Sequence, residues 1–423
     1  MQSRFVIYIP TDTREATALS FAKVAGVPLL LRSILALASA GETSFTIITP
    51  ANHRRQLLKS WQRIVKDRSI HLNLILTRDG NKLSRDEIRE LKGCVQSNFY
   101  FINANYVLPG IARLAQGGGG GNVQVFKPIT KRLAVVGAST KHIDAIEPAT
   151  VEDFLAQLAS AKDRRYFTTG DDGIIVQKFS ERSAAEHMLT EYIRKNTPMF
   201  IAREINKRIS LPVSLVLARL RVSPNTITIV NIFIGLCAGI GAAGLTYTGV
   251  LLGAILFEIA SIVDGCDGEV AKLTFRTSKF GQYIDSISDN LSLASFLTGM
   301  MIHQYRITDK INSFVWGGLL LIGVAGILAI MADYLKRRTN SASFVTYDKE
   351  FLQRLPADKT PKLILFLVKY LKILFKKDCF STVFLLFAIL GILHWWFYII
   401  TVGVWGAVAV LFYLRRSESA LAH

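Results

Sequence analysis

Residues 261–290 read SIVDGCDGEVAKLTFRTSKFGQYIDSISDN and place four aspartates in an otherwise strongly apolar part of the chain. Asp264 and Asp267 are three residues apart and Asp285 and Asp289 are four apart, so each pair lies on one helical face. Charged residues inside membrane helices are costly and mark functional sites. Four carboxylates on two adjacent antiparallel helices repel one another without a cation, and all-oxygen ligation suits Mg²⁺ or Mn²⁺.

The sequence around these aspartates predicts a membrane domain. The chain is 50% hydrophobic, and its apolar residues gather in long runs after residue 226. Runs of about 18 or more apolar residues are candidate transmembrane helices. We predict a six-span domain at 223–416, with spans at 226–246, 249–272, 281–303, 313–335, 379–397 and 399–414.

Basic residues orient these spans. Inner segments carry Arg219, Arg221, Lys272, Arg276, Lys279, Lys336, Arg337, Arg338, Lys376, Lys377, Arg415 and Arg416, and outer loops carry only Arg306 and Lys310. The positive-inside rule then puts both termini and the acidic cluster in the cytosol of a bacterial or archaeal type cell membrane. Membrane anchoring also explains the net charge of +18 without a nucleic-acid partner. The N-terminus lacks the features of a signal peptide.

Two further segments are predicted to lie at the membrane surface. Residues 178–222 form a linker and an amphipathic helix, in which basic residues interrupt apolar ones at helical spacing. Residues 361–377 are apolar but contain Lys369 and Lys372, which favours a second interfacial helix over a seventh span.

Residues 1–177 are predicted to form a cytosolic α/β domain. Short β-type runs alternate with helical stretches, which indicates a largely parallel sheet. The strands are expected at 5–9, 45–49, 72–76, 99–103 and 133–136, with a helix at 28–40. Five glycines at 117–121 lack a following Lys-Ser/Thr and are interpreted as a surface loop.

Small residues lie on the same helical faces as the acidic pairs. Gly268 and Ala271 share the face of Asp264, and Gly281 precedes Asp285 by one turn. Such positions let a ligand or another helix approach the backbone closely. Helix packing alone explains one pair easily, but it explains two matching pairs poorly.

These positions resemble the signature of the CDP-alcohol phosphotransferase family. The resemblance covers about 200–415, where Ser223–Thr228 is similar to the entry to the family's first span and Lys377–Asp378 to a basic-acidic pair before its fifth. One position departs, because Lys272 stands where the family usually has Arg, and a lysine cannot bind phosphate in a bidentate manner. The positions that correspond to the signature, including the departing Lys272, are Asp264, Asp267, Gly268, Ala271, Lys272, Gly281, Asp285 and Asp289.

The resemblance implies a six-helix membrane fold, a homodimer, and one or two divalent ions that hold the pyrophosphate of a CDP-linked donor. It makes Asp264, Asp267 and Asp285 metal ligands, and Asp289 both a metal ligand and the general base. It assigns Gly268, Ala271, Lys272 and Gly281 to the nucleotide pocket.

Three polar residues outside the motif are interpreted separately. Asn225 and Thr228 lie at the inner end of the first span and either contact the nucleotide phosphates or ribose, or have no such role, in which case Ser223 or Asn225 caps the helix. Glu258 lies deep in the second span and needs a partner or a proton, so we expect a hydrogen-bonded structural role.

The N-terminal domain resembles sugar-nucleotide and sugar-alcohol cytidylyltransferases in the run 26–30. It lacks the family's Gly-rich loop, because residues 10–15 contain no glycine, and Asn103 and Asn105 stand near the expected metal-binding Asp. A tight backbone approach to a triphosphate is difficult without glycine. We therefore expect a degenerate nucleotidyltransferase-like domain that is inactive or regulatory, with an active cytidylyltransferase as the alternative.

The expected reaction is metal-dependent transfer of a substituted phosphate from a CDP-alcohol, such as CDP-diacylglycerol, to an acceptor alcohol with release of CMP. An inositol-phosphate-type transferase is the alternative within this class. A secondary transporter would place its acids near the bilayer midplane and show inverted repeats. A membrane-tethered cytidylyltransferase leaves the aspartates unexplained. The four cysteines have no metal-binding spacing.

Overall fold

The computed structural model describes residues 2–11, 13–65, 70–78, 82–107, 109, 123–126, 135–143, 150–159, 164–167, 173–198, 200–308, 311–338 and 377–421. The chain divides into two compact units. The first is Met1–Ile193 with Ala218–Leu220 and Leu273–Phe275, and the second contains the rest. The glycines at 117–121 and nearly all of the segment 361–377 lie outside the described residues.

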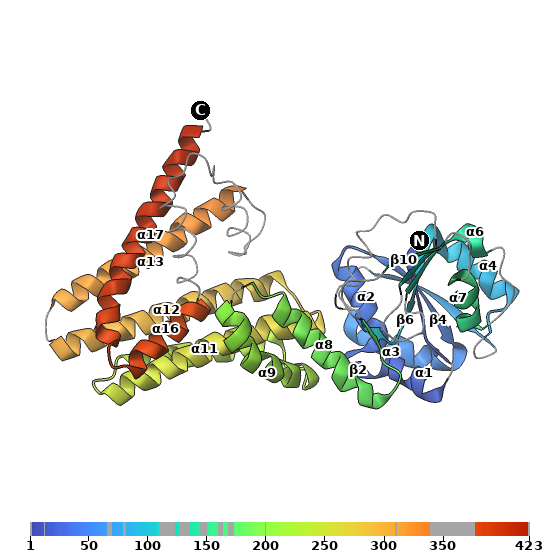
Figure 1. Cartoon of the computed structure of the whole chain (residues 1–423), viewed down its shortest axis with the longest axis horizontal. Helices are drawn as coiled ribbons and strands as arrows, with labels where there is room; N and C mark the ends of the chain where they lie inside the picture. The colour runs from blue at the N-terminus through green and yellow to red at the C-terminus, as the bar shows by residue number, and fades with distance from the viewer. Residues whose placement is uncertain are drawn as a thin grey trace. The chain divides into compact units, whose positions relative to one another are not determined.

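A seven-stranded mixed sheet forms the centre of the first unit (Figure 1). Its order is β10-β8-β9-β6-β1-β4-β5, and β6, β1, β4 and β5 run parallel. Strand β9 is antiparallel to both neighbours, so the sheet is mixed. The strands are β1 (Ser3–Tyr8), β4 (Ser44–Pro50), β5 (His71–Thr77), β6 (Val95–Asn103), β8 (Val123–Phe126), β9 (Val135–Ser139) and β10 (Arg164–Phe167).

Helices cover both faces of this sheet. Alternate residues of β1 point to opposite sides, so Phe5 and Ile7 pack with one set of helices and Val6 and Tyr8 with the other. The first set contains α2 (Leu29–Ser39) and α3 (Arg54–Val65), and the second contains α4 (Arg85–Cys94), α6 (Thr140–Ile143) and α7 (Val151–Ala159). The predicted α/β architecture is confirmed.

The remaining small elements of this unit are α1 (Arg14–Phe21), η1 (Ala51–His53), η2 (Phe179–Glu181) and the two-stranded pairs β2–β3 and β7–β11. These strands are β2 (Lys23–Val24), β3 (Val27–Pro28), β7 (Tyr106–Val107) and β11 (Ile174–Ile175).

Residues 178–222 hold more than the one amphipathic helix that we expected. Helix α8 (Arg182–Lys195) ends before Pro198, a residue that disfavours helical backbone before it. A π-helical turn, η3 (Ala202–Asn206), then leads directly into α9 (Lys207–Arg219).

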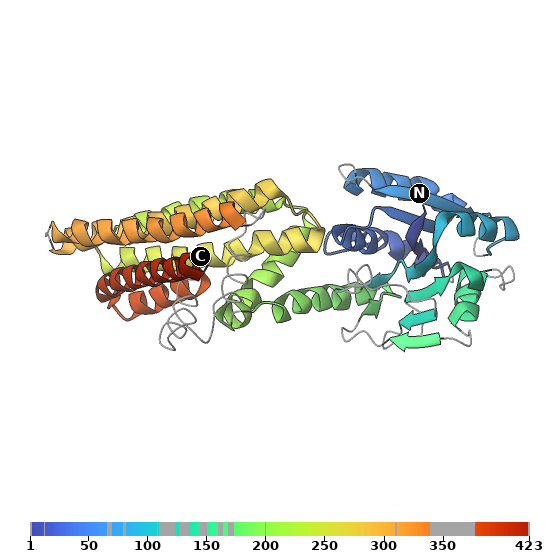
Figure 2. The same ribbon diagram turned by 90° about the horizontal axis from the view of Figure 1, so that it is seen from above.

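The second unit is helical (Figure 2). Helix α10 packs along α12, and α13 packs against α17. Their shared core contains stacked Phe257 and Phe296 beside Phe384. The helices are α10 (Pro224–Ala242), α11 (Tyr247–Thr274), α12 (Lys279–Thr308), α13 (Asn312–Arg338), α16 (Lys377–Ile389) and α17 (Leu393–Leu421).

Two helices among the described residues, α10 and α11, are long and apolar enough to cross a membrane by length and composition. Large apolar side chains are also exposed on several helices of this unit, including Phe233, Ile240, Ile322 and Phe412. Extensive exposed apolar surface is typical of a protein or membrane contact. A helical C-terminal part is thus confirmed, and six spans remain a prediction.

The boundary between the last two predicted spans is wrong. We expected helices at 379–397 and 399–414, but α16 ends at Ile389 and α17 starts at Leu393. Gly391 has a φ of +71°. Its amide donates to the Ala388 carbonyl and that of Ile392 to Phe387, which is the Schellman pattern of a helix end.

Replacing Gly391 with alanine should destabilise the protein. A Cβ there has space, with Tyr247 the nearest side chain at 4.0 Å, but a left-handed backbone costs an L-residue about 1–2 kcal/mol. Thermal unfolding of the full chain in nanodiscs should show a lower midpoint. Gly406→Ala, in a helical position with open space around it, is the control and should not lower the midpoint. Equal midpoints for both variants would contradict this account.

Candidate metal and phosphate-transfer site

The four aspartates lie on two consecutive helices joined by a short turn. Asp264 and Asp267 are in the last part of α11, and Asp285 and Asp289 are in the first part of α12. The Ser278 hydroxyl accepts a hydrogen bond of 2.9 Å from the Gly281 amide and so caps the start of α12. The turn therefore brings two pairs that are about 20 residues apart in sequence to one end of a helix pair.

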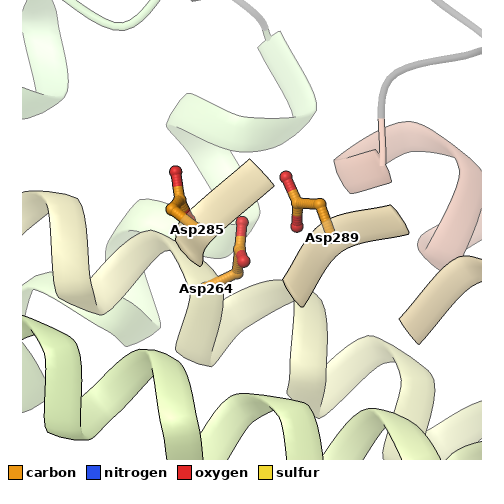
Figure 3. A group of neighbouring side chains, drawn as sticks. All are labelled: Asp264, Asp285 and Asp289. Carbon is orange, nitrogen blue, oxygen red and sulfur yellow. The ribbon is translucent and has the colours of Figure 1, made fainter. Parts of the chain in front are cut away.

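Three of these aspartates form one group. Asp264, Asp285 and Asp289 each offer a carboxylate oxygen, and these oxygens lie within 4.8 Å of one another (Figure 3). Oxygen ligands on opposite sides of a hard cation are about 4–5 Å apart. The three side chains are partly buried, so the donor set fits a divalent cation that a ligand can still reach.

Electrostatics also favour a cation. Two unit charges about 5 Å apart repel by about 3 kcal/mol at an effective dielectric constant of about 20. Three carboxylates at this spacing contain three such pairs. A bound cation relieves this repulsion, and its site would be formed by Asp264, Asp285 and Asp289.

Lys377, the first residue of α16, also belongs to this site. Its ammonium donates a hydrogen bond to Asp289, and its Nζ lies 3.2 Å from Oδ1 of Asp264. One lysine does not balance the nearby aspartates, so the site keeps a net negative charge. Sequence reasoning linked Lys377 only to a family pair, because it lies 88 residues from Asp289.

Asp267 is placed differently from the other three aspartates. Its carboxylate accepts a hydrogen bond from the Thr228 hydroxyl of α10 and is 6% exposed. It interacts electrostatically with Asp285 but is not part of the group of three. The Thr228 hydroxyl also lies 3.1 Å from the Pro224 carbonyl. Thr228 therefore supports an acidic residue of the motif.

Asn231 was missed by sequence reasoning. Its amide nitrogen donates to Oδ1 of Asp264 at 3.0 Å and lies 3.4 Å from the Ser288 hydroxyl. The residue is fully buried on α10, between the two helices that carry the aspartates. The one signal in the sequence that could have identified Asn231 is that it is a polar residue inside a predicted span. Its hydrogen bond fixes one orientation of the Asp264 carboxylate.

Asn231→Ala should weaken the site without removing a charge. Groups that orient metal-binding side chains are worth about 10–100-fold in metal affinity or activity. We expect a rise of about 10-fold in the Mn²⁺ concentration that gives half-maximal turnover. Asn290→Ala is the matched control, because that amide donates only to the Ser286 carbonyl of its own helix. An unchanged Mn²⁺ requirement in Asn231→Ala would show that the contact does not support Asp264.

The small residues of the motif serve two purposes. A Cβ added at Gly268 would meet no atom of the described residues within 4 Å, so this part of the structure leaves space beside the aspartates. A Cβ at Gly281 would lie 3.0 Å from Oδ1 of Asn225, so this glycine allows close contact between α12 and the first turn of α10. The Ser223 hydroxyl, not Asn225, caps α10 by accepting from the Thr226 amide at 3.1 Å.

The two remaining motif positions, Ala271 and Lys272, lie at the end of α11. Ala271 is half-buried, and its carbonyl accepts from the Arg276 amide at 2.9 Å. Lys272 is exposed. A ligand pocket at these residues, and at Asn225, stays a prediction.

In the N-terminal unit, polar side chains around α1, near the position of the expected Gly-rich loop, hydrogen-bond to one another and to the backbone. Thr13 caps α1 by accepting from the Ala16 amide at 3.0 Å. Asn105 donates to the Ala16 carbonyl at 2.8 Å and accepts from the Ser20 hydroxyl at 2.7 Å. Both Asn103 and Asn105 are buried. Their polar atoms bind the protein itself.

Comparison with known proteins places the aspartates in a defined region. Residues 221–402 match the profile of the family described as CDP-alcohol phosphatidyltransferase. The chain is 33% identical over 188 residues to the bifunctional IPC transferase and DIPP synthase of Thermococcus kodakarensis, which is 44% of this chain and 40% of that protein. It is 35% identical over 86 residues to the archaetidylinositol phosphate synthase of Pyrococcus horikoshii, 20% of this chain and 44% of that one.

These matches span less than half the length of either relative. Among solved structures, the inositol-1-phosphate CTP transferase from T. maritima is similar over 45% of this chain and 96% of its own, with 10% identity and a TM-score of 0.34.

Proposed function

We propose that the protein transfers a substituted phosphate from a CDP-alcohol to an acceptor alcohol and releases CMP, because residues 221–402 match the CDP-alcohol phosphatidyltransferase family. The observation that carries this proposal is the group of three aspartate oxygens within 4.8 Å of one another. The group lies inside the family match and contains both ends of the motif.

The proposed chemistry is a single displacement. The acceptor hydroxyl loses its proton to Asp289 and its oxygen forms a bond to the β-phosphorus of the donor. The bond from that phosphorus to the bridging oxygen breaks, and CMP leaves with the bonding electrons. A carboxylate within hydrogen-bond reach can accept such a proton. No covalent enzyme intermediate is required.

The residues around the base have separate proposed roles. Asp264, Asp285 and Asp289 would hold Mg²⁺ or Mn²⁺, with Asp267 adjacent. The ion would neutralise the pyrophosphate oxygens of the donor. Lys377 orients Asp289 through its hydrogen bond. Gly268, Ala271, Lys272, Gly281 and Asn225 would form the pocket for the CDP moiety.

Inositol-containing substrates are favoured by the relatives. The printed names of the Thermococcus and Pyrococcus proteins describe a bifunctional IPC transferase and DIPP synthase and an archaetidylinositol phosphate synthase. We therefore propose an inositol phosphate as the acceptor, or CDP-inositol as the donor. The setting is an integral membrane protein with six spans, a cytosolic site and a homodimeric assembly.

A donor and acceptor screen tests this function. The purified full chain in lipid nanodiscs is given CDP-diacylglycerol or CDP-inositol with a set of alcohols that includes inositol phosphates. We expect CMP release only when an acceptor and Mg²⁺ or Mn²⁺ are both present. Metal-dependent CMP release that is equal with and without any acceptor alcohol would indicate hydrolysis and overturn the proposed transfer.

The N-terminal domain is proposed to be inactive as a cytidylyltransferase. Its support is the hydrogen bond from Asn105 to α1. Full-length Asp289→Asn protein, incubated with CTP, inositol 1-phosphate and Mg²⁺, should form no pyrophosphate above the level without protein. Steady formation of pyrophosphate with matching CDP-inositol would show that the domain is active.

A further inference from the structure

A second group of polar side chains reaches α11 at Ser261, one helical turn before Asp264. Asp378, the residue after Lys377, accepts hydrogen bonds on Oδ1 from the Asn206 amide at 3.0 Å and the Ser261 hydroxyl at 3.3 Å. These three residues come from α16, η3 and α11. Lys377 and Asp378 are neighbours on a helix and point about 100° apart. One therefore serves the aspartate site and the other serves this second group.

Glu258 brings another carboxylate to the second group. It precedes Ser261 by one helical turn, and its Oε1 accepts from the Thr382 hydroxyl at 3.1 Å. Thr382 follows Asp378 by one turn of α16, so both acids lie in the contact between α11 and α16. Glu258 is only 8% exposed, and its buried Oε2 has no hydrogen-bond partner in the part of the chain that the structure describes.

Asn206 adds an unpartnered oxygen to this group. Its nitrogen donates to Asp378, whereas its buried Oδ1 has no partner among the residues that the structure describes, and the residue is 4% exposed. Asn206 is the last residue of the π-helical turn η3. Single π-turns inside helices are rare and are often found at functional sites. Here the turn places an amide beside Asp378.

Two buried oxygens of this group have no hydrogen-bond partner among the described residues. Within the part of the chain that the structure describes, neither Glu258 nor Asp378 forms an ion pair with a basic residue. A protonated Glu258 can donate from Oε1 to the Thr382 hydroxyl, which itself donates to the Asp378 carbonyl, but Oε2 of Glu258 would still have no partner among the described residues. Buried acids of this kind are stabilised by pairing or by metal coordination.

We propose that Asn206, Glu258 and Asp378 form a second cation site, filled by a hard cation that prefers oxygen ligands. Two carboxylates and an amide oxygen are the donor types of such ions, and Ser261 and Thr382 add hydroxyl oxygens. Glu258 is six residues before Asp264, so the two residues are about 9 Å apart along α11 and point about 120° apart around it.

The proposed ion has a structural consequence for the first site. It connects η3, α11 and α16 at Asp378, the residue next to Lys377. Holding the start of α16 would keep the Lys377 ammonium against Asp264 and Asp289. The second cation is therefore a positioning element, and its binding does not depend on the proposed reaction.

Thermal unfolding without the first site tests the proposal. The full-length triple variant Asp264→Asn, Asp285→Asn, Asp289→Asn in nanodiscs is stripped with chelator. It is then titrated with chlorides of Mg²⁺, Mn²⁺, Ca²⁺, Na⁺ or K⁺ at constant ionic strength. At least one cation should raise the midpoint saturably by about 5 °C at saturation. The absence of any cation-specific shift in this background would overturn the proposal.

Further variants in the same background locate the ion. Glu258→Gln and Asn206→Ala should each remove the shift, whereas Asn206→Asp should keep it. Gln304→Ala is the matched control, because Gln304 is also buried with an unpartnered amide oxygen but lies in α12 beside Tyr398. It should keep the shift. A shift that survives in Glu258→Gln would overturn the assignment.

Metal content gives a readout that does not depend on the unfolding of one variant. If Glu258→Gln does not fold, Asn206→Ala and the triple variant are compared by mass spectrometry of bound metal after dialysis against the stabilising cation. We expect about one ion fewer per chain in Asn206→Ala, and equal content would overturn the site. Because every protein in this series lacks Asp289, failure of this proposal is distinguishable from failure of the transferase proposal.

Discussion

Asp289→Asn should reduce the turnover of CMP release by about 100-fold to 10,000-fold, the range for loss of a general acid or base. Asparagine keeps the size of the side chain but cannot take the proton of an acceptor hydroxyl. It also removes one of the three carboxylates that lie within 4.8 Å of one another. The measurement is the steady-state rate of CMP release by the full chain in nanodiscs, with donor and acceptor both saturating.

Two controls separate loss of the base from loss of the fold. Ser286→Ala alters a half-buried residue on the same helix, whose hydroxyl donates to the Gln282 carbonyl and, among the described residues, to no other group, and should keep near-normal turnover. The thermal midpoint of Asp289→Asn should stay close to that of the unmodified chain, because the substitution relieves carboxylate repulsion. Near-normal CMP release from Asp289→Asn would show that another group is the base.

Removal of divalent metal should have an effect of similar size. Chelator should lower CMP release by about 100-fold or more, because an ion that stabilises phosphate charge contributes several kcal/mol to the transition state. Mg²⁺ or Mn²⁺ should restore the rate, and Na⁺ or K⁺ at equal ionic strength should not. The experiment measures initial rates across a metal titration of chelator-treated protein.

Variants of the aspartates connect this requirement to named side chains. Asp285→Asn should shift the metal titration to higher concentration by at least about 10-fold, since it removes a charged ligand from the group of three. Asn290→Ala, whose amide donates only within α12, should leave the titration unchanged. If Asp285→Asn titrated like the unmodified chain, the metal would have to bind elsewhere.

The relation between Lys377 and the aspartates bears on both results. In the described structure Lys377 already pairs with Asp264 and Asp289, two residues of the proposed metal site. Its single charge lowers the repulsion between the carboxylates but does not cancel it. The Lys377 ammonium thus connects two of the aspartates, and the remaining negative charge of the described group can attract a divalent ion.

Local spacing was enough to predict the acidic faces. A helix repeats every 3.6 residues, so Asp264 with Asp267 and Asp285 with Asp289 must share faces wherever these segments are helical. Alternation of β-type and helical runs likewise predicted the α/β unit, because each run has its own hydrophobic period. The helices α10 to α13 begin and end within a few residues of the predicted spans. These features depend only on near neighbours in the sequence.

The tertiary structure alone decided which residues surround those faces. Asn231 reaches Asp264 from 33 residues away, Lys377 reaches Asp289 from 88, and Asn206 reaches Asp378 from 172. No periodic pattern within one segment encodes such contacts, because they depend on how helices pack. Packing also separated Asp267 from the other three aspartates by pairing it with Thr228. The sequence by itself therefore predicted the acidic faces of the site, and tertiary packing determined which side chains orient and neutralise them.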